Sequence, residues 1–357
     1  MTTPALAEAA RLTALFVAAG AVPVEADILQ PAARLLDLYG EDIRARAYVT
    51  SDPLRGELML RPDFTLPVVE RHMAHGADPA RYCYQGVVFR RQELDDGRPS
   101  EYLQAGYEIF DRGDPDAADA EVFSLFSGAL AGIPVRAVTG DIGILAAAVR
   151  GLATSEARKA ALMRHIWRPA RFRALLDRFA GRVPAPAGRA ALLAAADPLA
   201  GAGPEIGERS REEVEARIAT LRADSALPPL SAGQVELLAE VLALAGPARE
   251  ALGRLRSLEA GMPEMRDAVD RLERRLDALE RRGVDTETLA FEASHGRSAM
   301  EYYDGFVFSF HGPADGPALA TGGRYDALTR VLGRGRSIPA VGGVIRPDLV
   351  VRARAGA

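Results

Sequence analysis

The sequence has 357 residues, and 48% of them are hydrophobic, which is enough to bury a large core and predicts two domains or one domain with a large insertion. A formal net charge of −5 argues against a protein that binds nucleic acid mainly through positive charge, and the single cysteine, Cys83, excludes an internal disulfide and a cysteine-based metal site. The chain has no uncharged apolar stretch of membrane-spanning length and no basic region before its first apolar helix, so we expect neither a transmembrane span nor a signal peptide. The single cysteine in an apolar strand favours a reducing cytoplasm as the location.

The first part of the chain is predicted to alternate helices with short extended segments. Hydrophobic periodicity predicts a helix over 4–18, and an extended piece over 22–25 is followed by a helix over 32–38 and extended pieces over 46–50 and 57–61. A turn with Asp63 and Thr65 then starts a helix that runs to about His75. These two side chains can cap the helix, which the residues alone favour, or they can present a carboxylate and a hydroxyl to an amine.

Residues 82–89 and 102–110 are predicted to be two strands joined by a charged loop centred on 95–98. Arg90 follows the first strand, while Gln104 and Glu108 occupy alternating positions of the second, so the three can face one pocket. A cation, an amide and a carboxylate suit a zwitterionic ligand or a nucleotide phosphate. The alternative is a solvated hairpin with surface charges, and this segment alone favours neither.

The middle of the chain changes character. After a helix over 119–130, a strand over 135–139 and a helix over 142–152, the residues from 152 to 285 are rich in Ala, Leu, Arg and Glu and predict a helical insertion. The last helix of this region carries an apolar stripe, which indicates core packing or a seam with a partner rather than a ligand site. The stripe consists of Met265, Val269, Leu272, Leu276 and Leu279.

Strand patterns return over 288–292, 306–310, 318–321 and 340–345, with helices starting after 322–326 and at 346–348. Because strands outnumber crossover helices, we predict an α+β core with an antiparallel sheet flanked by helices, formed by 1–151 and 286–357 around the insertion 152–285. The common phosphate-loop, dinucleotide, zinc-protease and serine-hydrolase motifs are absent from the sequence, and the five histidines show no metal-ligand spacing. We therefore expect no cofactor and no metal.

Five segments, in this order, resemble the catalytic core of the class II histidyl-tRNA synthetases. They are residues 60–65, the hairpin 89–110, residues 301–308, residues 322–326 and residues 340–343. The resemblance implies a class II aminoacyl-tRNA synthetase-like fold.

The resemblance also implies a histidine pocket. By the pattern of the family, Asp63, Thr65 and Gln104 would meet the α-amino group of histidine, and Arg90 would lie near its carboxylate. Glu108 and Tyr303 would meet the imidazole, and Tyr302 belongs to the same motif as Tyr303. A carboxylate beside a ring nitrogen is chemically suited to histidine.

Three departures from the family pattern concern ATP. Leu349 stands where the synthetases have the arginine that holds the phosphates, Ser298 replaces another arginine, and Gln92 replaces a glutamate. An apolar side chain cannot replace a guanidinium on a triphosphate, and activation depends on such positioned charges. The resemblance therefore implies a degenerate ATP site, and because the sequence stops at Ala357, we expect no anticodon-binding domain.

A synthetase-like core without activation chemistry resembles the regulatory subunits of ATP phosphoribosyltransferase. This resemblance implies a homodimeric core that catalyses nothing itself, joins the short catalytic subunit in a hetero-oligomer, supports the first step of histidine biosynthesis and transmits feedback by L-histidine. One alternative is a truncated synthetase-like enzyme that forms an aminoacyl-adenylate for a non-tRNA acceptor. Another is a tRNA-binding module, which would need a basic face that the composition does not favour; we expect no nucleic-acid partner.

Overall fold

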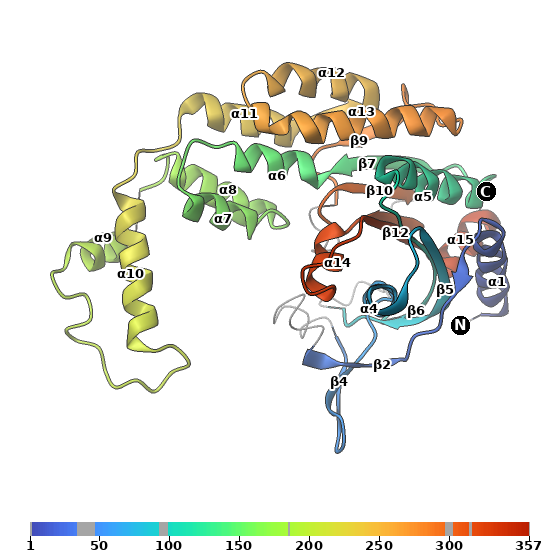
Figure 1. Ribbon diagram of the computed structural model, residues 1–357, viewed down its shortest axis with the longest axis horizontal. Helices are drawn as coiled ribbons and strands as arrows, with labels where there is room; N and C mark the ends of the chain where they lie inside the picture. Colours follow the sequence, from blue (N-terminus) through green and yellow to red (C-terminus); the bar gives the residue numbers. More distant parts are fainter. Residues whose placement is uncertain are drawn as a thin grey trace.

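The computed structural model describes residues 2–33, 47–92, 99–184, 186–296, 303–313 and 316–356. Most of the helix predicted over 32–38, the centre of the charged loop at 95–98, Ser298 and Tyr302 lie outside these ranges. Within them, the chain forms a large mixed sheet with helices against it and a helical arm that projects from one side (Figure 1).

The main sheet has nine described strands in the order β1-β5-β6-β12-β11-β10-β7-β9-β8. Neighbouring strands are antiparallel except in the pairs β1–β5 and β7–β9, which are parallel and lie toward the two edges. The predicted α+β fold with a largely antiparallel sheet is confirmed. The strands are β1 (Val22–Pro23), β5 (Ala80–Phe89), β6 (Glu101–Phe110), β7 (Arg136–Asp141), β8 (Ala245–Pro247), β9 (Ala290–Glu292), β10 (Phe306–His311), β11 (Ala320–Arg324) and β12 (Ala340–Ile345).

A second, three-stranded antiparallel sheet has the order β2-β4-β3, with β2 (Leu29–Pro31), β3 (Val49–Asp52) and β4 (Gly56–Leu60). The hairpin of β3 and β4 extends away from the core (Figure 1). Strand β4 leads directly into the turn before α4 (Thr65–His75), and α4 lies inside the curve that β5, β6 and β12 form (Figure 1). The small sheet therefore positions the first part of the predicted pocket.

The core lies between the main sheet and the helices on its outer face. Successive residues of a strand point to opposite faces, so Phe306, Phe308 and Phe310 of β10 share the face that α5 covers. The Phe123 ring of α5 lies 5.6 Å from Phe308 and 5.0 Å from Phe310, centroid to centroid. Such aromatic contacts fix the helix on the sheet. The helices around the core are α1 (Thr3–Ala18), α5 (Pro115–Ala129), α6 (Ile142–Arg150), α14 (Asp326–Leu332) and α15 (Pro347–Ala355).

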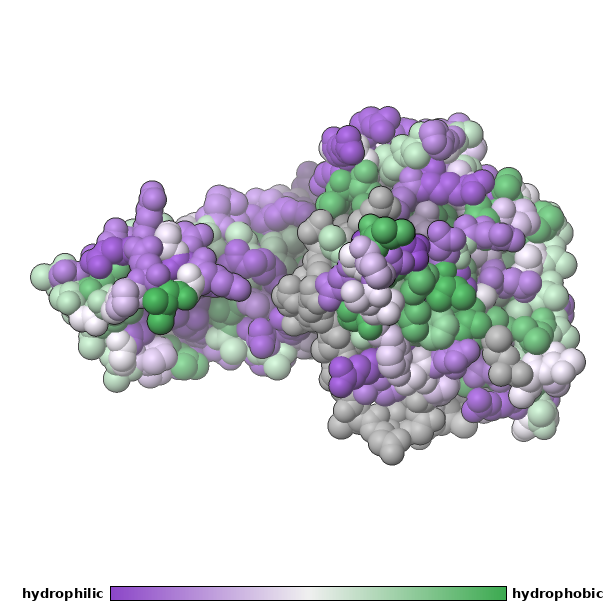
Figure 2. Space-filling model, turned by 90° about the horizontal axis from the view of Figure 1, so that it is seen from below, coloured by the Kyte–Doolittle hydropathy of each residue, from purple (hydrophilic) through white to green (hydrophobic). Residues whose placement is uncertain are grey.

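The region predicted as a helical insertion is helical for most of its length. Its elements are α7 (Glu156–Met163), α8 (Pro169–Phe179), α9 (Ala187–Ala194), α10 (Arg211–Ser225), α11 (Ala232–Ala243), α12 (Ala248–Glu259), a short 3₁₀ turn (Pro263–Met265) and α13 (Arg266–Arg281). Helices α9 and α10 form the end of the projecting arm, whose surface is largely hydrophilic on the face seen in Figure 2. The domain limits 152 and 285 stay a prediction.

Two parts of this region belong to the main core. Helix α13 packs against α5 with its predicted stripe buried, so the stripe is a core face. Strand β8 adds to the end of the main sheet beside β9, although it falls inside the range predicted to be helical. Its sequence Ala-Gly-Pro has no β-branched or aromatic residue, so local propensity gives no sign of a strand. Among the described helices, none has both the length and the apolar character needed to cross a membrane.

Candidate functional site

The site is built on strand β6. Gln104, Gly106 and Glu108 alternate along β6 and therefore share one face of the sheet, while Tyr107 points to the opposite face. Strand β5 pairs with β6 so that Tyr84 lies opposite Gly106. A Cβ atom at Gly106 would collide with the Tyr84 ring, so the glycine leaves the space that this ring occupies. The ring thereby reaches the neighbouring Glu108.

The carboxylate of Glu108 is the centre of a buried hydrogen-bond cluster. Its Oε1 accepts hydrogen bonds from Thr65 Oγ1 at 3.1 Å and from the Tyr84 hydroxyl at 2.9 Å. Its Oε2 accepts one from the Tyr325 hydroxyl at 2.6 Å. Thr65 is the first residue of α4, and Tyr325 follows β11 directly. One carboxylate thus joins three consecutive elements, α4, β5 and β6, to the distant end of β11.

Burial controls the charge of this group. The pKa of Glu108 is raised to about 7, chiefly because burial desolvates the carboxylate; hydrogen bonds from Tyr325, Tyr84 and Thr65 lower the pKa, and the nearby Asp63 carboxylate raises it. Burial and the Glu108 charge also hold the pKa of Tyr84 and of Tyr325 well above the ordinary value, so both hydroxyls keep their protons and donate. The Glu108 carboxyl therefore titrates close to neutral pH.

The structure brings several predicted pocket residues to this cluster. Thr65 bonds Glu108 directly, and α4 has Phe64 at its N-cap without a side-chain capping hydrogen bond, so the capping interpretation of Thr65 is wrong. Asp63 is buried, and its charge acts on Glu108 and Tyr84. Gln104 is also buried on the Glu108 face, and its Oε1 has no hydrogen-bond partner among the residues that the structure describes.

Arg90 lies at the other end of this face. Its Nε donates to the carbonyl oxygen of Pro62 at 2.9 Å, which ties the end of β5 to the turn that carries Asp63. Its guanidinium carbon lies 6.0 Å from the centroid of the Tyr102 ring, and the guanidinium carbon of Arg346 lies 5.2 Å from the same centroid. Two cations therefore flank one aromatic side chain of β6, in the part of the site predicted to receive a carboxylate.

The predicted imidazole partner Tyr303 is buried, and its ring lies against Gly323 of β11. It is close enough to Tyr325 to influence that hydroxyl electrostatically. Tyr302 and Ser298 fall outside the described residues, so their predicted places in the pocket and in the degenerate ATP site stay predictions. The pocket roles of Asp63, Thr65, Arg90, Gln104, Glu108 and Tyr303 are likewise predictions that the arrangement accommodates.

Of the residues predicted to form a degenerate ATP site, Gln92 and Leu349 make ordinary structural contacts. The Gln92 amide donates to the carbonyl oxygens of Arg90 at 3.3 Å and Pro99 at 3.2 Å, which closes the base of the hairpin. Leu349 is half-buried and packs against the hydrophobic core. Neither side chain carries a charge, as the resemblance predicts for these two positions.

Two residues of the cluster, Tyr84 and Tyr325, were not predicted as site residues. Tyr84 belongs to an apolar strand, where an aromatic residue indicates core. Its hydroxyl function follows only from the pairing of β5 with β6, which places it beside Glu108. Tyr325 lies in the segment 322–326 that carries part of the resemblance, and this position was the one sign in the sequence that Tyr325 could belong to the site.

Gly342 gives a direct test of how closely this site is packed. In the pairing of β12 with β6 it lies opposite Glu108, and a Cβ atom there would overlap the Glu108 carboxylate. We expect Gly342→Ala to lower the free energy of unfolding by about 1–3 kcal/mol, because overpacking forces the carboxylate away from its donors. Urea denaturation measures this change.

Gly253→Ala is the matched control for that substitution. Gly253 lies inside α12, and a Cβ atom there would have no packing neighbour within 4 Å among the described residues, so alanine should raise stability by about 0.5–1 kcal/mol. An unchanged free energy of unfolding for Gly342→Ala would mean that the Glu108 carboxylate has room to move.

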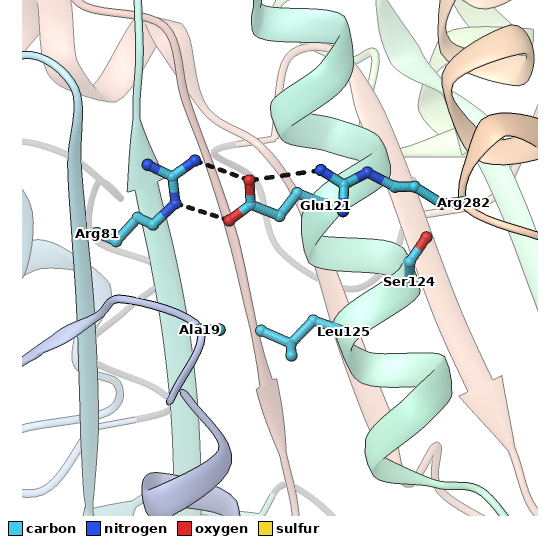
Figure 3. Close-up of a pocket in the computed structure, with 6 residues that line it drawn as sticks. All are labelled: Ala19, Arg81, Glu121, Ser124, Leu125 and Arg282. Atoms are coloured by element: carbon cyan, nitrogen blue, oxygen red, sulfur yellow. Dashed lines mark hydrogen bonds and ion pairs between the residues drawn. The ribbon is translucent and has the colours of Figure 1, made fainter. Parts of the chain in front are cut away.

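A pocket lies on the opposite face of the sheet from Glu108. Figure 3 shows Glu121 of α5 between two guanidinium groups, with Arg81 Nε at 2.7 Å and Arg282 Nη2 at 3.6 Å. The Tyr107 hydroxyl also donates to Glu121 at 2.8 Å. These charged groups bond one another, so the arrangement ties β5, α5 and the end of α13 together and is explained by packing.

Comparison with known proteins gives one matching family model, described as histidyl-tRNA synthetase, over residues 6–227 and 208–350. Curated relatives from Brucella canis and Brucella ovis, each named ATP phosphoribosyltransferase regulatory subunit, are 32% identical over 343 residues, covering 89% of this chain and 89% of theirs.

Solved structures show the same fold. A protein from Bacillus halodurans described as an ATP phosphoribosyltransferase regulatory subunit/histidyl-tRNA synthetase matches with a TM-score of 0.69 and 23% identity, covering 98% of this chain and 79% of the other. A histidyl-tRNA synthetase from Nostoc matches with a TM-score of 0.64 and 17% identity, covering 99% of this chain and 72% of the other. The class II synthetase-like fold is therefore confirmed.

Proposed function

The chain belongs to the family of ATP phosphoribosyltransferase regulatory subunits, built on the histidyl-tRNA synthetase fold, and on this premise we propose how it acts. It assembles as a homodimer with the short catalytic subunit of ATP phosphoribosyltransferase, makes that subunit active in the first step of histidine biosynthesis, and transmits inhibition by L-histidine. The phosphoribosyl transfer takes place on the partner, and this chain catalyses no reaction.

The observation that carries the histidine part of the proposal is the buried Glu108 carboxylate. It is held by three hydroxyl donors on the face that also carries Gln104, with the Asp63 carboxylate close by. An imidazole N–H suits an oriented carboxylate, and an ammonium group suits a second carboxylate with an amide oxygen. Arg90 supplies a cation for the ligand carboxylate at the far end of the same face.

The uncharged side chains at the predicted ATP site also support a regulatory role. Gln92 and Leu349 make hairpin and core contacts and bring no charge to a triphosphate. The cost of losing one positioned charge in such a reaction is a few kcal/mol, so two losses disfavour the alternative of an adenylate-forming enzyme.

The test is a reconstitution assay. We expect no phosphoribosyl transfer from this chain alone, strong activity when it is mixed with a short-form catalytic subunit, and inhibition of the mixture by L-histidine. Size-exclusion chromatography with light scattering should show both chains in one complex.

Two outcomes would contradict the proposal. A catalytic subunit that is equally active and equally histidine-sensitive without this chain would remove the regulatory role. Histidine-dependent exchange of pyrophosphate into ATP by the purified chain would instead favour the adenylate-forming enzyme.

A further inference from the structure

A buried group of charged side chains lies on the face of the sheet opposite the pocket. Asp119 of α5 accepts hydrogen bonds from two arginines, Arg275 Nε at 2.9 Å and Arg324 Nη2 at 2.6 Å. The side chains of Asp119 and Arg275 are 0% and 3% exposed. Two arginines from separate elements therefore share one carboxylate in the interior.

Arg275 connects this group to the outer helical layer. It lies on α13, and its Nη2 also donates to Asp141 Oδ2 at 2.7 Å. The other oxygen of Asp141 accepts from the backbone N–H of Gly143 at 2.8 Å and so caps the start of α6. The position of α13 is thus coupled to α5 and α6 through directed charged hydrogen bonds, which have stricter geometry than apolar packing.

Arg324 connects the same group to the pocket. It is the last residue of β11, and its side chain reaches Asp119 and the carbonyl oxygen of Pro115 on the helical side. The next residue, Tyr325, points to the other side of the sheet and donates to Glu108. Consecutive residues thus join the outer network to the pocket carboxylate, with one backbone linkage between them.

We propose that Asp119, Arg275 and Arg324 are positioning residues for the pocket: they fix Tyr325 against Glu108, so that the packing of α13 determines how well the pocket holds its ligand. The identity of that ligand, L-histidine, rests on the function proposed above. A movement of α13, for example when a partner binds to the helical layer, would change the Tyr325–Glu108 hydrogen bond. The reciprocal effect follows, because coupling between two sites is mutual.

The titratable groups that act on Glu108 determine what a titration should show. They are Asp63, Tyr84 and Tyr325, with the Thr65 hydroxyl as a further donor. Tyr325 contributes the largest lowering of the Glu108 pKa among the three hydroxyl donors. Displacing it should raise the Glu108 pKa and weaken ligand binding at neutral pH, whereas a general loosening of the fold would not move this one titration selectively.

The test compares Arg275→Met with Arg274→Met. Arg274 precedes Arg275 on α13, pairs with Asp116 at 2.6 Å, and has a side chain that is 57% exposed, so it lies outside the buried network. We expect Arg275→Met to raise the midpoint of the Glu108 carboxyl titration and to weaken L-histidine binding at pH 7 by about 2- to 30-fold. Arg274→Met should change neither value.

Infrared titration measures the carboxyl band, which Glu108→Gln assigns, and calorimetry measures histidine binding in the full-length chain. If Arg275→Met does not fold, Arg275→Lys keeps one positive charge and should show a smaller shift in the same direction. An unchanged Glu108 titration in every folded Arg275 variant overturns the inference. A shifted titration in a chain whose wild type binds no histidine supports the inference and refutes the histidine part of the proposed function.

Discussion

Glu108→Gln is expected to weaken L-histidine binding by about 10- to 150-fold, the effect of losing a hydrogen bond to a charged group worth about 1.5–3 kcal/mol. Glutamine keeps the shape of the side chain but carries no charge. Its NH₂ group cannot accept the hydrogen bond that Tyr325 or Tyr84 now donates to the carboxylate. Isothermal titration calorimetry at pH 8, where Glu108 is ionised, measures the change.

Glu121→Gln is the control for this prediction. Glu121 is also hydrogen-bonded by a tyrosine hydroxyl, but it lies on the opposite face of the sheet with Arg81 and Arg282. We expect its substitution to leave histidine affinity unchanged. Equal affinity of wild type and Glu108→Gln would show that the effector binds elsewhere, on the catalytic subunit or at the interface.

The affinity for L-histidine is expected to increase with pH around neutrality. Because burial raises the pKa of Glu108 to about 7, the carboxyl is largely protonated at pH 6 and largely ionised at pH 8. A protonated carboxyl accepts the N–H of a neutral imidazole less well than a carboxylate does, and the ring of free histidine is neutral above a pKa of about 6.5, so wild-type affinity should rise from pH 6 to pH 8. In Glu108→Gln this rise should be smaller, because the titration of the protein carboxyl has been removed.

Asp119→Asn is expected to cause the largest loss of stability among these variants, about 3–5 kcal/mol in the free energy of unfolding. The substitution removes the charge that Arg275 and Arg324 share, and leaves both guanidinium groups buried with less compensation. A typical domain has only about 5–15 kcal/mol of stability, so equilibrium urea denaturation should detect the loss easily.

Asp116→Asn is the matched control, since Asp116 lies one turn earlier in α5 and pairs with the neighbouring arginine of α13. Its partner Arg274 is solvent-exposed, and exposed ion pairs contribute about 1 kcal/mol or less. If the two asparagine variants lost equal stability, the buried network would be no more important than a surface ion pair.

The two strands that carry Tyr84 and Glu108 could be predicted from the sequence, because their hydrophobic residues and the charged loop between them are typical of a pair of strands. Residues 82–89 and 102–110 are apolar and β-prone on both sides of a charged loop, and both strands are present in β5 and β6. The placement of Thr65 and Glu108 in one pocket follows from the synthetase resemblance, and the hydrogen bond between them agrees with it.

Other features could not be derived from local sequence. The Glu108 donors Tyr84 and Tyr325 depend on the order and register of the strands, which are set by contacts between distant parts of the chain. Strand β8 likewise forms through contacts between distant parts of the chain, because its three residues have no intrinsic strand preference. The network around Asp119 joins α5, β11 and α13, whose residues are separated by 156 and 205 positions, and no spacing rule connects them.

The three hydroxyl donors of Glu108 also limit what the pocket can accept. A carboxylate offers about four lone-pair positions, and Thr65, Tyr84 and Tyr325 use three of them. The remaining position can satisfy a single N–H. A lysine or arginine side chain would bring several donors into this buried space and leave some of them without acceptors, at a cost of about 1–3 kcal/mol each. The protein's own hydroxyls would thus exclude the other basic amino acids by occupying the acceptors that these would need.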